Sequence, residues 1–267
     1  MKELSLFSGA GGGVLGTQLL GWETIGYVEY NEYCQRVIAQ RIEDEWLDEA
    51  PIFSDINTFI SEGYADAYKG MVGVVSAGFP CQPFSVAGKR GAEEDPRNCW
   101  PQTINIIRRV RPRYCLLENV GGLLSRKHRY FETILKDLAE SGYDARWKVI
   151  AAAEVGAAHK RDRLWVVAHT NGSRELQSEG SEQDEWRRAG YGSEEVSNTS
   201  SERLEGWELP IGESEEYATI GGTCWWHFEP RMGRVAHGMA HRVDRLKALG
   251  NGQVPAVAET AFRVLTR

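Results

Sequence analysis

Short apolar segments that alternate with helix-like segments constrain the fold of this chain more than any other feature. Seven segments read as strands, at residues 3–7, 24–28, 52–53, 71–77, 114–117, 145–151 and 164–168. Helix-like stretches occupy residues 14–20, 32–50, 60–70, 102–110, 130–141 and 255–265. Strands that alternate with helices favour a doubly wound, mainly parallel sheet. We therefore predict an α/β protein whose last two strands pair with each other.

One of the five cysteines stands apart from the others. Cys81 lies between Pro80 and Gln82-Pro83, shortly after the apolar segment that ends at Ala77. Reacting groups in open parallel sheets gather at the carboxyl ends of strands. The flanking prolines also restrict the ways in which the loop can present its thiol. Cys81 is therefore a candidate nucleophile, whereas a lone cysteine is more often a small buried hydrophobe.

A glycine-rich turn and two acidic residues follow the first three strands. The turn after the first strand contains Gly9, Gly11 and Gly12. Glycines let the backbone approach a ligand, and the amino end of the next helix offers free N–H groups. Glu29 ends the second strand, where an acidic side chain commonly binds ribose hydroxyls, and Asp55 follows the third. Singly each acid is more simply a loop charge or a helix cap, but their joint order suggests a nucleoside-bearing cofactor.

Charged residues also flank two later strands. Glu118 directly follows four largely apolar residues, where a buried carboxylate is costly unless it has a partner or a task. Arg161 and Arg163 alternate just before the strand at 164–168, so we expect both side chains on one face. A basic edge of this kind is often merely solvated, but here it can meet a base oxygen or a phosphate.

These motifs, with Leu249-Gly250-Asn251 and Val254-Pro255 near the end, resemble those of the DNA (cytosine-5) methyltransferases. The resemblance covers most of residues 2–170 and 229–265. The Pro-Cys-Gln loop, Glu-Asn-Val, the paired arginines and the closing segment occur in the order typical of that family. Two positions depart from it. The family usually has glutamine at His159, and its closing motif has a small residue and then valine after the asparagine, whereas this chain has Gly252-Gln253 before Val254.

The resemblance implies a class I S-adenosylmethionine-dependent methyltransferase with a Rossmann-like fold, which releases S-adenosylhomocysteine and uses no metal. Cys81 would add to C6 of a cytosine turned out of duplex DNA, because C5 alone is a poor nucleophile. Glu118 would hydrogen-bond N3 and the exocyclic amine, which requires part of its population to be protonated. Arg163 and Arg161 would hold the base oxygen. The implied catalytic residues are thus Cys81, Glu118, Arg161 and Arg163.

The same resemblance implies residues that bind the methyl donor and the DNA. Glu29 would bind the ribose, Tyr30 would lie against the adenine and Asp55 near its amine. The donor-binding set is Phe7, Gly9, Gly11, Gly12, Glu29, Tyr30, Asp55, Ile56, Pro80 and Asn251. Residues 85–97 resemble the loop that closes over DNA. The DNA-binding set is Gln82, Ser85, Lys89, Arg90, Arg97, Arg231, Arg234 and Arg242.

The net charge of −7 looks unsuited to a DNA partner until it is divided along the chain. Residues 171–220 hold 13 acidic and 4 basic residues, a net of −9, so the rest of the chain carries +2. We predict an acidic, low-complexity insertion or short target-recognition region at 171–228. It separates a catalytic and cofactor-binding domain at 1–170 from closing motifs at 229–267. Because acidic chain repels phosphates, DNA contacts are expected from Arg231 onward.

Composition excludes several other classes of protein. Five cysteines without a Cys-x-x-Cys pair argue against a disulfide framework and a zinc site. No apolar run approaches the roughly 20 residues of a membrane span. We therefore expect a cytoplasmic protein. The family resemblance implies duplex DNA as its partner, and we expect it to be a monomer.

Three alternative functions stay open on the sequence. A related branch of the family methylates transfer RNA. A protein that binds DNA without modifying it would be expected to have lost catalytic residues, yet Cys81, Glu118 and Arg163 are present. A thymidylate-synthase-like enzyme also attacks a pyrimidine with a Pro-Cys thiol, but the glycine turn with Glu29 and Asp55 favours adenosylmethionine. The target sequence, and a role in restriction-modification, phage self-protection or regulation, stay open as well.

Overall fold

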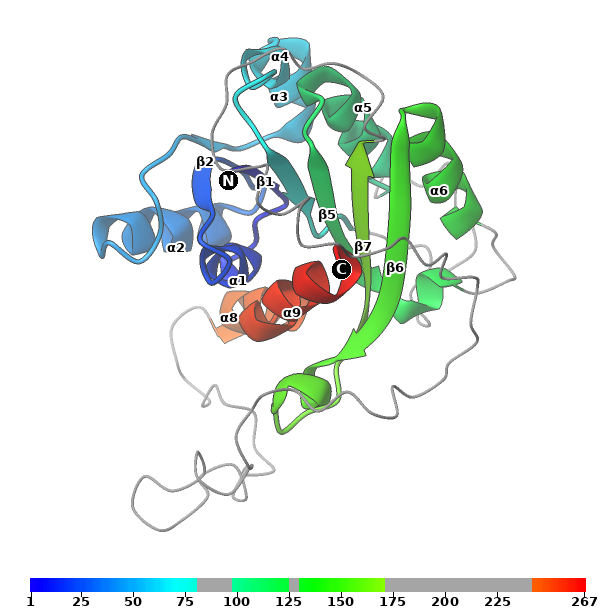
Figure 1. The fold of residues 1–267 in the computed structure, drawn as a ribbon. Helices are drawn as coiled ribbons and strands as arrows, with labels where there is room; N and C mark the ends of the chain where they lie inside the picture. Colours follow the sequence, from blue (N-terminus) through cyan, green and yellow to red (C-terminus); the bar gives the residue numbers. More distant parts are fainter. Residues whose placement is uncertain (81–97, 125–129, 171–241) are drawn as a thin grey trace. The chain divides into compact units, whose positions relative to one another are not determined.

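The sheet predicted from the sequence is present in the structure, a computed structural model that describes residues 1–80, 98–124, 130–170 and 242–267 (Figure 1). Within these residues, seven strands form one sheet in the order β3-β2-β1-β4-β5-β7-β6. The strands are β1 (Lys2–Leu6), β2 (Glu23–Val28), β3 (Ile52–Phe53), β4 (Val74–Ala77), β5 (Tyr114–Val120), β6 (Tyr143–Ala151) and β7 (Asp162–Thr170). The first five are parallel, and β7 runs antiparallel to β5 and β6. The predicted α/β class and the pairing of the last two strands are confirmed.

Helices cover both faces of the sheet because successive strand residues point to opposite sides. One face carries α1 (Gly12–Gln18), α2 (Glu32–Glu43) and α9 (Pro255–Leu265). The other face carries α3 (Ile56–Ser61), α4 (Tyr64–Ala67), α5 (Trp100–Val110) and α6 (Tyr130–Glu140). Two 3₁₀ turns, η2 (Gly121–Leu124) and η3 (Ala152–Val155), follow β5 and β6, and α8 (Arg242–Asn251) precedes α9 (Figure 1).

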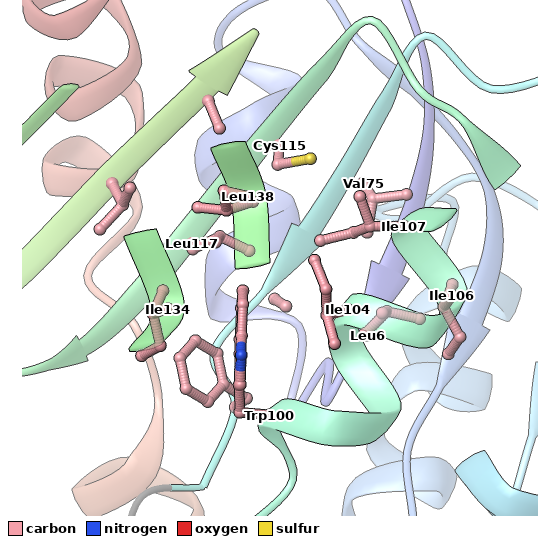
Figure 2. Packing of buried hydrophobic residues seen from close by; sticks show 14 of the residues in the cluster. Leu6, Val75, Trp100, Ile104, Ile106, Ile107, Cys115, Leu117, Ile134 and Leu138 are labelled. Atoms are coloured by element: carbon pink, nitrogen blue, oxygen red, sulfur yellow. The ribbon is translucent and has the colours of Figure 1, made fainter. Parts of the chain in front are cut away.

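The largest apolar cluster lies between the sheet and helices α5 and α6 (Figure 2). It includes Leu6, Val75, Cys115 and Leu117 from the strands, and Trp100, Ile104, Ile107, Ile134 and Leu138 from the helices. The indole nitrogen of Trp100 donates a hydrogen bond to Asp137 Oδ2 at 2.7 Å, and its ring lies 5.3 Å from that of Phe79. This packing fixes the carboxyl ends of β4 and β5. The chain continues from β4 toward Cys81, and Glu118 lies near the end of β5.

The closing helix α9 packs on the opposite face, next to α1 and across β6 and β7. Its buried residues Val257, Ala258, Ala261 and Leu265 meet Trp165 and Val167 of β7. Pro255 stands at the first helical position, where a missing N–H costs nothing. The predicted helix at 255–265 is confirmed, and it brings the end of the chain back to the first helix.

Three predicted elements differ from the structure. The helix predicted at 32–50 ends at Glu43, because the backbone turns through Glu45 at a φ of 60° and buries Leu47. The helix predicted at 60–70 is wrong: two short helices meet at Gly63, whose φ is 76°. The strand predicted to end at residue 117 continues to Val120, because β7 pairs with it beyond the end of β4.

A fully buried carboxyl group lies within the sheet, at Glu3 of β1. Its oxygens accept hydrogen bonds from the hydroxyls of Thr17, Thr24 and Ser76, of which the bond from Thr24 measures 3.1 Å. Burial raises the pKa of Glu3 above its ordinary value of 4.5, and the three hydroxyls only partly oppose this. The native state therefore keeps a proton that the unfolded chain releases.

This burial makes a prediction for stability as a function of pH. Since the folded pKa of Glu3 is raised, its contribution to stability is present below the unfolded pKa and is lost as pH rises through the folded pKa. We expect Glu3→Gln, which stays neutral at every pH, to gain stability relative to the unmodified protein as pH rises from 5 to 8. Urea unfolding at both pH values measures this, with the exposed Glu23→Gln as control. If the free energy of unfolding changes with pH in the same way for Glu3→Gln and for the unmodified protein, the raised pKa of Glu3 in the folded state is contradicted.

Candidate active site

The turn after β1 is shaped by residues with positive φ. Phe7, Gly9 and Gly11 have φ values of 54°, 57° and 86°, a region that glycine adopts without strain. The amide of Gly11 donates to the carbonyl of Ser8 at 3.0 Å and closes the turn. Gly12 then begins α1. The predicted glycine turn therefore lies at the carboxyl end of β1.

Glu29, at the end of β2, is bound to this turn. Its Oε2 accepts a hydrogen bond from the amide of Gly9 at 2.7 Å, and its Oε1 accepts one from the amide of Asn31 at 2.7 Å. Each carboxylate oxygen retains acceptor capacity for a further hydroxyl. Tyr30, the next residue, has 79% of its surface exposed. A carboxylate and an open aromatic ring side by side fit a ribose and a purine, so these residues fit the nucleoside part of an S-adenosylmethionine molecule.

Asp55 has a local structural role. Its Oδ1 accepts hydrogen bonds from the amides of Asn57 at 2.6 Å and Thr58 at 3.0 Å, which makes it the amino-terminal cap of α3. Ile56 is the first residue of that helix and is half-buried. The simpler interpretation of Asp55 as a helix cap is thus confirmed, and a contact with adenine stays a prediction.

Glu118 projects from β5 and forms a close ion pair with Arg163 of β7. The distance from Arg163 Nε to Glu118 Oε1 is 3.0 Å, and only 12% of the Glu118 side chain is exposed. Burial raises the pKa of Glu118, while Arg163, Arg161 and a hydrogen bond with the Gln253 side chain act in the lowering direction. A carboxyl group whose pKa is raised by burial is easier to protonate, and is therefore better suited to donate a proton.

Asn119, the next residue, holds the segment that leads to Cys81. Its Nδ2 donates to the main-chain carbonyl of Phe79 at 3.0 Å, and its Oδ1 accepts from the amide of Val120 at 2.8 Å. The Asn119 side chain is buried. It therefore ties the carboxyl end of β5 to the segment after β4, two residues before Cys81. Sequence reasoning assigned no role to Asn119, although its place beside a strand-end glutamate could have drawn attention to it.

Arg161 lies just before β7, the strand that holds Arg163. Its φ is 38°, so the strand alternation expected for the pair is broken before β7 begins. The Arg161 guanidinium donates to the carbonyl of Gly250 at 2.9 Å and also to that of Gly252. Arg161 thus lies outside the strand that holds Arg163, and the shared face expected for the two side chains stays a prediction. Arg161 holds the connection between α8 and α9 while its charge still acts on Glu118.

This contact makes a prediction for Arg161→Ala. The substitution removes two charge-assisted hydrogen bonds from the connection between α8 and α9. We expect a loss of roughly 1.5–3 kcal/mol from the free energy of unfolding, toward the lower end because Arg161 is only half-buried. Urea unfolding measures the loss, and Arg263→Ala on the outer side of α9, whose ion pair with Glu259 is local, is the control. Equal small losses for both variants would contradict the assigned role.

Other predicted site residues lie outside the part of the chain that the structure describes. These are Cys81, Gln82, Ser85, Lys89, Arg90, Arg97, Arg231 and Arg234. Arg242 begins α8, but its side chain is outside the described residues as well. Pro80 and Asn251 are exposed, at the ends of the β4 segment and of α8. The boundaries predicted for the acidic insertion at residues 171–228 also involve undescribed residues and stay predictions.

The thiols that the structure describes are poor nucleophiles. Burial raises the pKa of Cys34 to about 11, and it also raises the pKa values of Cys99 and Cys115. A thiol with a raised pKa has little thiolate at neutral pH. None of these three residues competes with Cys81 as the candidate nucleophile.

Across residues 1–80, 98–124, 130–170 and 242–267, no group of three or more His, Cys, Asp or Glu side chains is arranged to hold a metal ion. Nor does any helix in those ranges combine the length and apolar character needed to cross a bilayer.

The glycine turn, Glu29 and the Glu118–Arg163 pair lie at the same end of the sheet, where the parallel strands have their carboxyl ends. Comparison with known proteins identifies the family to which the chain belongs. The sequence profile of the C-5 cytosine-specific DNA methylases matches residues 1–243. The chain belongs to this family. That result confirms the resemblance predicted from the Pro-Cys-Gln and Glu-Asn-Val motifs.

Two curated type II methyltransferases are similar to more than half of this chain. The type II methyltransferase M.NgoMIV of Neisseria gonorrhoeae is 33% identical over 171 residues, which are 63% of this chain and 52% of the relative. The type II methyltransferase M.AplI of Arthrospira platensis is 34% identical over 167 residues, 62% of this chain and 45% of the relative. The chain thus spans about half the length of the curated relatives that it matches.

A solved structure shares the fold of this family member. It is a candidate DNA modification methyltransferase encoded within a prophage of E. coli, with a TM-score of 0.51 and 22% identity. The match covers 64% of this chain and 47% of the other. At this level of identity the likeness supports the Rossmann-like, class I methyltransferase fold, in agreement with the strand order observed here.

Proposed function

We propose that the chain carries the catalytic machinery of a DNA (cytosine-5) methyltransferase. The substrate is a cytosine rotated out of duplex DNA, and the product is 5-methylcytosine. S-adenosylmethionine, when bound at the turn after β1, supplies the electrophilic methyl group and leaves as S-adenosylhomocysteine. The residues that would hold it are Phe7, Gly9, Gly11, Gly12, Glu29 and Tyr30. The predicted donor-binding set is completed by Asp55, Ile56, Pro80 and Asn251.

The chain's own residues supply the activation of the base. The Cys81 thiolate forms a bond to C6, and the electron pair displaced from the C5–C6 double bond enters the ring. Glu118 donates its proton at N3, so the ring carries no net negative charge. C5 then takes the methyl group, and the N3 proton returns to the Glu118 carboxylate. The C5 proton leaves to a base, and the electron pair of the C5–H bond restores the C5–C6 double bond and expels the Cys81 thiolate. Arg163 keeps Glu118 in place and balances the negative charge of its carboxylate.

The observation that carries this proposal is the buried Glu118–Arg163 pair beside the segment that leads to Cys81. A carboxyl group that burial makes easier to protonate stands next to Asn119, which fixes the main chain at Phe79. Glu118 is thereby suited to donate a proton to a cytosine ring that the Cys81 thiolate attacks. No other buried pair of opposite charge with this exposure occurs among the described residues.

Bisulfite sequencing of DNA from cells that express the chain tests the proposal. We expect protected cytosines within one short sequence motif, and none in cells that express Cys81→Ser. Purified protein is then offered duplex DNA, transfer RNA and free deoxycytidine monophosphate with labelled S-adenosylmethionine. Transfer to RNA or to the free nucleotide instead of DNA would overturn the substrate assignment, and binding of DNA without transfer would overturn the enzyme assignment.

A further inference from the structure

A glutamine between α8 and α9 occupies a position where three parts of the proposed site meet. Gln253 is half-buried, and its main chain lies against the first turn of α1. A Cβ atom placed on Gly12 would lie only 2.5 Å from the Gln253 carbonyl oxygen. The close approach of these two segments brings the closing part of the chain to the glycine turn that follows β1.

The carboxamide of Gln253 fills the gap between two glycines from different elements. A Cβ atom on Gly13 of α1 would lie 2.2 Å from Oε1, and one on Gly78, just after β4, would lie 2.6 Å from Nε2. Real Cβ atoms do not approach other atoms this closely, so neither glycine can carry a side chain while Gln253 keeps its place. The carboxamide is therefore packed between the donor-binding turn and the segment that leads to Cys81.

The nitrogen end of this carboxamide meets Glu118. The same Cβ position on Gly78 lies 3.3 Å from Glu118 Oε2, and the side chains of Gln253 and Glu118 are hydrogen-bonded. Arg163 takes the other carboxyl oxygen, Oε1. Each oxygen of Glu118 thus has its own neighbour: a cation on one side and a neutral amide on the other. An amide donor orients a carboxyl group without adding a second positive charge.

The main chain around Gln253 is fixed independently of its side chain. Arg161 binds the carbonyls of Gly250 and Gly252, and the amide of Gly252 donates to the carbonyl of Ala248 at 2.8 Å. Val254 then caps α9, whose first turn is buried on the sheet. A change of the Gln253 side chain alone therefore leaves these anchors in place, so the effect of the carboxamide can be tested separately.

We propose that Gln253 is a positioning residue for Glu118. Its carboxamide, packed between Gly13 and Gly78, hydrogen-bonds the Glu118 carboxyl group and holds it against Arg163 in the orientation that meets the base. The inference rests on the proposed function, because it assigns Gln253 to the same reaction. The position is one where the sequence departs from the family pattern, so this glutamine is a feature of the chain's own site.

The first test measures the titration of Glu118 in the protein without substrate. Glutamate labelled with ¹³C at its carboxyl carbon gives an NMR signal for Glu118, which its disappearance in Glu118→Gln assigns. Loss of a hydrogen bond to the charged form raises a carboxyl pKa. We expect a higher titration midpoint in Gln253→Met, which keeps the length of the side chain, and in Gln253→Asn, which withdraws the amide. Gln40→Met, the same change on an exposed position of α2, leaves the midpoint unchanged.

The second test measures methyl transfer over a range of pH. We expect a loss of roughly 10- to 100-fold for Gln253→Met near neutral pH. The limb of the pH–rate profile that reports Glu118 moves to higher pH, in the same direction as the NMR midpoint. A residue that only fills space would lower the rate at all pH values equally and leave both midpoints in place.

The outcomes separate this inference from the proposed function. An unchanged Glu118 midpoint in folded Gln253→Met or Gln253→Asn overturns the positioning role, whether or not methyl transfer is seen. Failure of both variants to fold assigns Gln253 to stability and overturns it too. If the unmodified protein transfers no methyl group while the midpoint still moves, the contact with Glu118 stands and the proposed reaction fails.

Discussion

Glu118→Gln is expected to abolish nearly all methyl transfer while leaving the protein folded. Glutamine has the shape of glutamate and can still accept the hydrogen bond from Arg163, which lies 3.0 Å from Oε1. It has no proton to give to the base. Because general acid catalysis typically contributes about 10²- to 10⁴-fold, we expect a rate loss in this range.

Steady-state and single-turnover assays with a short duplex measure this loss. Glu23→Gln, at an exposed position of β2, is the matched control and should keep the unmodified rate. Donor affinity, measured by calorimetry with S-adenosylhomocysteine, should be unchanged in both variants, because neither Glu118 nor Glu23 is among the predicted donor-binding residues. A Glu118→Gln protein that transfers methyl groups at the normal rate would remove Glu118 from the mechanism.

Trp100→Ala is expected to give the largest loss of stability. Trp100 is 1% exposed and its indole lies in the main core (Figure 2). The indole also donates a hydrogen bond to Asp137. Removal of a buried tryptophan side chain typically costs about 3–5 kcal/mol through lost burial and the cavity left behind. Since domains are stable by only about 5–15 kcal/mol, this variant should unfold at much lower urea concentration.

Two further variants give this prediction its control and its structural detail. Trp46→Ala removes the same side chain where it is 64% exposed, and should change stability by no more than about 0.5 kcal/mol. Trp100→Phe keeps the ring beside Phe79 but loses the bond to Asp137, at a cost of about 0.5–1.5 kcal/mol. Equal losses for Trp100→Ala and Trp46→Ala would mean that the α5–α6 core does not support the sheet as described.

The strands and the edge of the sheet that carries the site could be predicted from the sequence. Apolar segments such as that ending at Ala77 have the length of buried parallel strands, and turn residues bound them. Glu118 stands out because a carboxylate directly after an apolar strand is costly without a partner or a task. Glu29 stands out because an acidic residue at the end of the second strand commonly binds ribose hydroxyls. These signals are local, so a single sequence is enough to read them.

The parts that sequence reasoning got wrong or missed depend on contacts between distant residues. The end of β5 is set by pairing of Glu118 with Trp165, which lies 47 positions further along the chain. Arg161 lies just before β7, and its guanidinium bonds to the carbonyls of Gly250 and Gly252. Gln253 was recognised only as a departure from the family pattern, since its neighbours come from α1, β4 and β5.

Asp55 shows how one residue can satisfy a local rule and a family pattern together. Its carboxylate caps α3 through the amides of Asn57 and Thr58, which explains an aspartate at that position without any ligand. Glu29 differs, because its two oxygens bind amides on separate segments, those of Gly9 and Asn31. Geometry therefore makes Glu29 the stronger candidate for contact with the donor.

The central claim is that the Cys81 sulfur adds to the pyrimidine ring, and a covalent trap tests it most directly. Duplex DNA with 5-fluorocytosine at the target position is incubated with the protein and S-adenosylmethionine. Fluorine cannot leave C5 as the proton does, so the enzyme should stay joined to C6. We expect a denaturation-resistant complex whose peptide map places the DNA on Cys81, and no complex with Cys81→Ser. The absence of any adduct with a duplex that the protein methylates in its unfluorinated form, or an adduct on another residue, would contradict the account.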